Sequence, residues 1–174
     1  MAGMALAGRK TALVYRSPKS KPLADELVRV RTNRVTEVIP ADHRAPHRIK
    51  EMLKDGWMVG MLVDQHYAQG IDVTFFNRCC KVNPLIARLA RIIDCNIHGT
   101  RVVRLPNDQF CLEVTEPIDA QRDAEGKIDI SATMQAITSV IEGWVREYPE
   151  QWLWLHRRWR PIDNAGTSAQ REGK

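Results

Sequence analysis

Hydrophobic and polar residues follow one another in short blocks over the first third of the chain, and these blocks predict strands separated by helices. Apolar runs at 11–15, 36–39 and 57–63 have the length and composition of strands. Between them, residues 21–34 and 44–54 carry apolar side chains at helical spacing among charged ones. The run 57–63 is almost wholly apolar, which predicts a strand buried on both faces of a parallel sheet that helices cover.

The rest of the chain predicts a more mixed set of elements. These are an edge-like strand at 72–76, a helix from 83 to 93, strands at 96–105 and 109–115, and a long helix at 131–148. Asn83 and Pro84 supply the N-cap and first-turn residues of the first of these helices. The alternation of strands and helices predicts an α/β fold with a mixed, largely parallel sheet flanked by helices.

Length and composition limit the number of domains that the chain can form. The chain has 174 residues, of which 44% are hydrophobic, enough for one packed domain. We expect this domain to cover residues 1–162 and the polar residues 163–174 to form a disordered tail. The longest uncharged apolar run, residues 56–63, is far shorter than the roughly 20 residues that a membrane-spanning helix needs.

Charge is distributed unevenly along the chain, whose net charge is +5. Residues 1–60 hold 12 Lys and Arg against 6 Asp and Glu, whereas residues 106–150 hold 3 against 10. Such polarity suggests a basic face for an anionic partner, although a solvated surface with a modest basic excess explains the totals more simply. The four cysteines lack the spacing of a metal site, and reduced thiols are the simplest account of them.

Polar residues directly follow two of the predicted strands. Arg16 comes after the strand at 11–15, and Asp64 and Gln65 come after the run 57–63. In parallel sheets, reactive groups gather beyond the carboxyl ends of the strands. We therefore expect Arg16 and Asp64 to meet at one edge of the sheet, either in a functional site or in a structural ion pair.

Four segments that stand in one order along the chain carry a resemblance. They are Val14-Tyr15-Arg16, Val63-Asp64-Gln65, Val73-Thr74-Phe75-Phe76 and the stretch PEQWLWLHRRW at 149–159. Together they resemble the lipid A biosynthesis acyltransferases, the late lauroyl- and myristoyl-transferring members of the lysophospholipid acyltransferase superfamily. The resemblance covers residues 1 to about 161 and rests most specifically on the C-terminal stretch. It implies a glycerolipid acyltransferase-like fold that here lacks its N-terminal part.

The resemblance also implies an activity. Enzymes of this kind move a fatty acyl chain from acyl carrier protein to a hydroxyl of a lipid A precursor at the cytoplasmic face of the inner membrane. They need no metal or other cofactor, and nucleic acid is not an expected partner. Their base is a histidine that takes the proton of the acceptor hydroxyl and is oriented by a carboxylate five residues later.

The sequence departs from this pattern at the catalytic base, because none of its five histidines has an acidic residue five positions later. We therefore expect the chain to begin after the family's active-site histidine and its N-terminal membrane helix, and to be inactive alone. Two smaller departures are His98-Gly99, where the family usually has Val-Pro, and Asn77, where a Gly is frequent.

By resemblance, Arg16 and Asp64 lie near the centre of acyl transfer. Arg16 is expected to bind a phosphate or to stabilise developing negative charge, as a guanidinium does well. Asp64 is expected to pair with Arg16 or to position the sugar. Gln65 and Arg104 are further expected substrate-binding residues.

The C-terminal stretch is expected to serve several purposes at once. Trp152 and Trp154 can anchor the end of the long helix against the sheet or lie in the lipid headgroup layer. Arg157 and Arg158 are expected to turn outward to phosphates of the disaccharide or of lipid headgroups. The alternative is a structural role, in which these arginines stack on Trp159 or Trp154.

Two other functions fit parts of the sequence. A non-catalytic module that binds anionic lipid or phosphate would use the same basic edge. A nucleic-acid binder ranks last, because no recognised module is present and the tryptophan cluster lacks the interleaving of a stacking platform.

Overall fold

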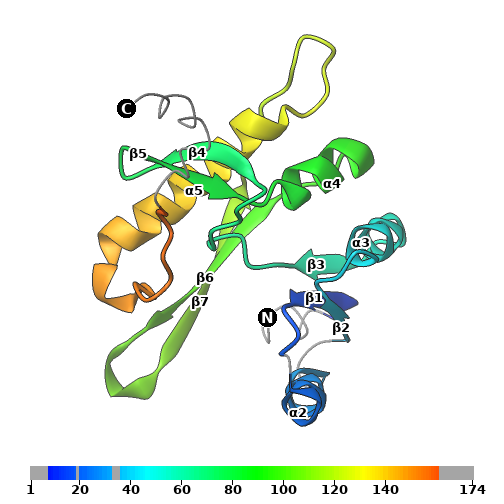
Figure 1. The fold of residues 1–174 in the computed structure, drawn as a ribbon, viewed down its shortest axis with the longest axis vertical. Coiled ribbons are helices and arrows are strands. Elements are labelled where there is room, and N and C mark those ends of the chain that lie inside the picture. The colour runs from blue at the N-terminus through cyan, green and yellow to red at the C-terminus, as the bar shows by residue number, and fades with distance from the viewer. Residues whose placement is uncertain (1–7, 19, 33–35, 161–174) are drawn as a thin grey trace, which may run out of the picture.

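The computed structural model describes residues 8–18, 20–32 and 36–160, so the predicted tail at 163–174 lies outside the described residues. The helices and strands are β1 (Thr11–Tyr15), α2 (Lys21–Thr32), β2 (Glu37–Pro40), α3 (Ala45–Lys54), β3 (Met58–Gly60), β4 (Ile71–Phe75), β5 (Arg78–Val82), α4 (Leu85–Ile93), β6 (His98–Arg104), β7 (Phe110–Pro117) and α5 (Ile130–Glu147). Figure 1 shows the small sheet of β1, β2 and β3 beside a second part built around α5.

The first part is a parallel sheet with strand order β2-β1-β3. Leu13 in the central strand lies opposite Val38 of β2 and Gly60 of β3. Helix α3 packs on this sheet through its apolar stripe, and together they bury Ala12, Ile39, Ala45, Ile49 and Met52. The three strands end at the same edge of the sheet because all of them run in the same direction.

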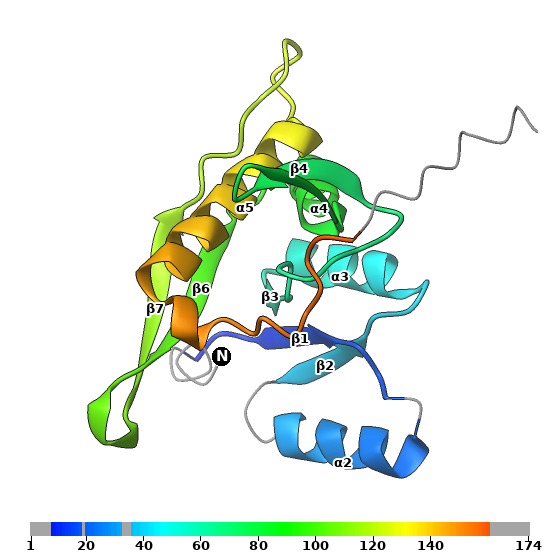
Figure 2. The same cartoon turned by 60° about the vertical axis from the view of Figure 1, so that its left-hand side comes forward.

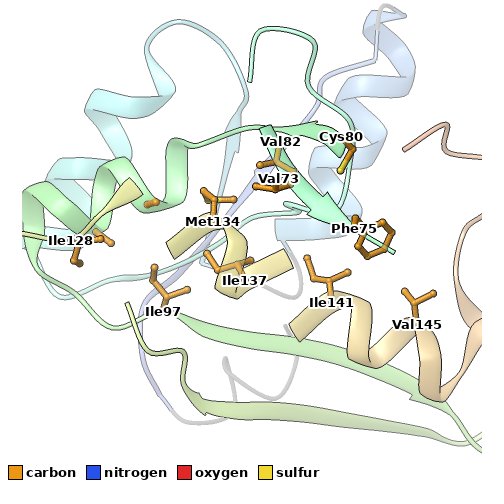
Figure 3. Packing of buried hydrophobic residues seen from close by; sticks show 12 residues of the cluster. Val73, Phe75, Cys80, Val82, Ile97, Ile128, Met134, Ile137, Ile141 and Val145 are labelled. Carbon is orange, nitrogen blue, oxygen red and sulfur yellow. The ribbon is translucent and has the colours of Figure 1, made fainter. Parts of the chain in front are cut away.

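The second part surrounds α5, which lies between two antiparallel hairpins (Figure 2). One face of α5 packs against the β4–β5 hairpin, and Figure 3 shows Ile137 and Ile141 directed toward Val73 and Phe75. Another face packs against the β6–β7 hairpin, since the Trp144 indole lies over Gly99 of β6.

Helix α4 belongs to both parts. Leu89 is buried in the core of the parallel sheet, whereas Ala87 and Ala90 are buried in the core around α5. The Asn83 Oδ1 accepts a hydrogen bond from the Leu85 backbone N–H at 3.0 Å, so Asn83 satisfies a donor of the first turn from one position before Pro84, which is the N-cap. Because one short helix fills both cores, it fixes the two parts relative to each other.

The predicted mixed α/β fold is confirmed, with one parallel sheet and two antiparallel hairpins, but two details of the prediction are wrong. The run 57–63 forms a strand only at Met58–Gly60, and that strand is half-buried rather than covered on both faces. The reason is that β3 pairs with β1 alone and forms a sheet edge, beyond which Leu62 is 75% exposed. The second error is the omission of β5, which pairs with β4 through a turn at Phe76 and Asn77.

The packing of Trp144 on Gly99 predicts a difference between two glycine variants. A Cβ at Gly99 would lie 2.7 Å from the Trp144 Cη2, so Gly99→Ala forces the indole out of place and should lower the free energy of unfolding by about 1–3 kcal/mol. Gly143 lies in α5, where an added Cβ would meet no atom within 4 Å, so Gly143→Ala should raise the free energy of unfolding by about 1 kcal/mol. Urea unfolding measures both changes, and equal effects of the two variants would contradict the prediction.

Candidate active site

The two residues expected at the sheet edge, Arg16 and Asp64, do leave the parallel sheet on the same side. Arg16 directly follows β1, and Asp64 lies four residues after β3, the parallel neighbour of β1. Arg16 is exposed and Asp64 is half-buried. The predicted ion pair between them is not formed in the described part of the chain. The segment after β3 is bound instead by the C-terminal segment, residues 149–160.

Arg158 is the residue that holds this segment. Its side chain is buried, with 2% of the residue exposed. The Arg158 Nη1 donates hydrogen bonds to the backbone carbonyls of Val63, at 3.4 Å, and of Gln65, at 3.1 Å. The guanidinium also lies over the Phe75 ring, 5.2 Å from its centroid. The prediction that Arg158 turns outward is therefore wrong, because carbonyls and an aromatic face inside the protein bind the cation.

Aromatic side chains fix the C-terminal segment on the end of β4. The rings of Phe75 and Trp159 stack at 5.4 Å, and the Trp159 Nε1 donates to the Phe75 carbonyl at 3.2 Å. Trp152 lies 6.1 Å from the same phenylalanine ring, which confirms it as an anchor against the folded body. The cation over the Trp159 ring is Arg78, at 5.1 Å, a contact that the sequence did not suggest.

Several buried polar atoms gather around this contact without a hydrogen-bond partner among the described residues. They are the Asp64 Oδ1, the His66 Nδ1, and the Nε and Nη2 of Arg158. Burial lowers the pKa of His66, and the positive charges of Arg160, Arg158 and Lys81 lower it further, against a backbone hydrogen bond with Arg158 that raises it. At neutral pH these effects favour the neutral form of the His66 imidazole.

The remaining predicted residues lie apart from this cluster. The Arg104 backbone exchanges hydrogen bonds with the Gln151 side chain at 2.8 and 3.2 Å, and its guanidinium lies over Phe110 near the turn of the β6–β7 hairpin. Arg157 is exposed. The structure thus brings together Asp64, Gln65 and Arg158, and it places Arg16 at the same edge of the sheet.

The described ranges contain no group of three or more His, Cys, Asp and Glu side chains that could hold a metal ion. Nor is any helix in those ranges both long enough and apolar enough to cross a bilayer. Arg16 offers an exposed guanidinium at the same edge of the sheet as the half-buried Asp64, and guanidinium and carboxylate groups suit the phosphate and hydroxyl groups of a sugar.

Comparison with known proteins bears on what this site does. A family model described as bacterial lipid A biosynthesis acyltransferase matches residues 1–161. A search of curated proteins finds no match.

The surroundings of His66 predict its titration. An NMR titration of the His66 side chain should give a midpoint below about 6.5, the ordinary histidine value. Arg160→Gln should raise the midpoint because it removes one of the nearby positive charges, whereas Lys54→Gln on α3 should leave it unchanged. A midpoint above 6.5 in the unaltered chain would show that the imidazole is not held neutral.

Proposed function

Because the chain belongs to the bacterial lipid A biosynthesis acyltransferase family, we propose that it acts in the transfer of a fatty acyl chain from acyl carrier protein to a hydroxyl of a lipid A precursor. The observation that supports this proposal most directly is the position of Asp64 and Gln65. They follow β3 at the carboxyl edge of the parallel sheet, the edge at which Arg16 follows β1, and Arg158 in the stretch 149–159 binds the backbone carbonyls on both sides of Asp64.

At this edge Arg16 is exposed and Asp64 and Gln65 are half-buried, and each has a proposed part in acceptor binding. Arg16 binds a phosphate of the disaccharide or stabilises negative charge that develops during transfer. Asp64 and Gln65 orient the sugar hydroxyls through hydrogen bonds. Arg157 and Arg104 contact phosphates farther from the reacting hydroxyl.

A base for the acceptor hydroxyl is missing from these 174 residues. The residues five positions after the histidines are Arg48, Met52, Ile71, Val103 and Pro161, and none of them is acidic. We therefore propose that the chain alone binds the acceptor without acylating it.

The purified chain should bind a phosphorylated, acylated glucosamine disaccharide and show no transfer from acyl carrier protein to it. Arg16→Ala should weaken this binding about tenfold, because a charge-assisted contact to phosphate is lost. Arg88→Ala, which removes an exposed cation from α4, serves as the control for net charge and should have little effect. Robust turnover by the unaltered chain would overturn the proposal that it is inactive alone, and equal effects of the two variants would reject the role of Arg16.

We also propose peripheral contact with the cytoplasmic face of the inner membrane through residues 153–157. Leu153 is 58%, Trp154 is 54% and Leu155 is 89% exposed, and the exposed Arg157 follows them. Apolar and indole side chains beside a cation suit the boundary between lipid headgroups and acyl chains. The same observation favours the second candidate function, a non-catalytic module that binds anionic lipid.

Vesicles of phosphatidylethanolamine and phosphatidylglycerol test this contact. The chain should sediment with them, and binding should fall with added salt because the headgroup attraction is screened. Leu155→Ala should weaken binding, whereas Val102→Ala, at a 56% exposed position on β6, should not. Binding that the first variant leaves intact would place the membrane contact elsewhere.

A further inference from the structure

We propose that Arg158 is a positioning residue for the acceptor site, which acts by fixing the backbone on both sides of Asp64. This inference rests on the proposed function only in treating Asp64 and Gln65 as acceptor-binding groups. It differs from the expected role of Arg158 as a phosphate ligand, since the side chain is buried.

The segment between β3 and β4 needs such support. For residues 62–66, the carbonyl contacts with Arg158 are the only backbone hydrogen bonds to other described residues. The next one along the chain joins the Tyr67 N–H to the Lys81 carbonyl at 3.2 Å. The Arg158 Nη1 therefore holds the backbone on both sides of Asp64, and the hydrogen bond of His66 with the Arg158 backbone adds a side-chain contact to the same segment.

The contact of Arg158 with the Val63 and Gln65 carbonyls, the clamp, is anchored to the core around α5. Phe75, over which Arg158 lies, is fully buried, and its carbonyl accepts the hydrogen bond from the Trp159 indole. Asp64 is thus fixed relative to the core around α5, whereas Arg16 belongs to the parallel sheet. Arg158 consequently sets how the carboxylate and the exposed guanidinium of the site stand relative to each other.

Burial of a cation is a costly way to secure a loop. The Nε and Nη2 of Arg158 are buried without a partner among the described residues, and apolar side chains in such positions often give equal or greater stability. The single Nη1, with its two N–H groups, reaches both carbonyls while the flat guanidinium stacks on the Phe75 ring, a combination that no other side chain offers. The cost therefore points to a demand for geometry rather than for stability.

The test uses the full chain with Arg158→Lys, which keeps the charge and the aliphatic stem but loses the planar guanidinium, and with Arg158→Gln as a second variant. Backbone order parameters of residues 62–66, measured by NMR relaxation, should fall in both variants because the Val63 and Gln65 carbonyls lose their donor. Gly99→Ala, destabilised at the α5–β6 contact, controls for loss of stability alone and should leave the order parameters of that segment unchanged. Unchanged order parameters in a folded Arg158 variant would overturn the clamp.

Binding of the phosphorylated disaccharide then tests the link to Asp64. Arg158→Lys and Asp64→Asn should each weaken binding about tenfold, and the double variant should also stay near tenfold, because both changes remove the same positioned carboxylate. A loss near a hundredfold in the double variant would show independent roles and overturn the link. If the unaltered chain does not bind the disaccharide, the proposed function fails, and the order parameters of residues 62–66 still decide whether Arg158 acts as a clamp.

Discussion

A buried guanidinium determines how the segments around the candidate site meet. Arg158 has no acidic partner among the described residues, so two main-chain carbonyls and the Phe75 ring are what stabilise its charge. A cation in a medium of low dielectric constant needs all of these contacts, because each alone leaves most of the desolvation cost in place. The C-terminal segment, the end of β4 and the loop after β3 are therefore held as one unit.

The loop in this unit passes from one core to the other. Met61 at its start packs on the core of the parallel sheet, whereas Val63, next to Asp64, packs on the core around α5. Helix α4 fixes the two parts relative to each other. It contributes Leu89 to one core and Ala87 and Ala90 to the other. A site built across such a junction depends on packing far from its own side chains.

Local patterns in the sequence predict the helices well, because a face of apolar residues at helical spacing must be buried wherever the helix lies. They fail where tertiary neighbours decide the outcome. The run 57–63 looks buried, yet its strand ends at Gly60 because only β1 pairs with it. Arg158 looks exposed, yet its acceptors lie 95 and 93 residues earlier in the chain, where no local pattern could indicate them. The positions of Arg16 and Asp64 follow from strand order alone, and these were predictable.

The same charges bear on what His66 can do. In a histidine–carboxylate arrangement, the acid stabilises the imidazolium that forms as the histidine takes a proton. His66 instead lies near Arg160, Arg158 and Lys81, and its burial together with these cations lowers its pKa and opposes protonation. A histidine among cations therefore lacks the charge stabilisation that a carboxylate partner gives, and its neutral ring suits a hydrogen bond better than the acceptance of a proton.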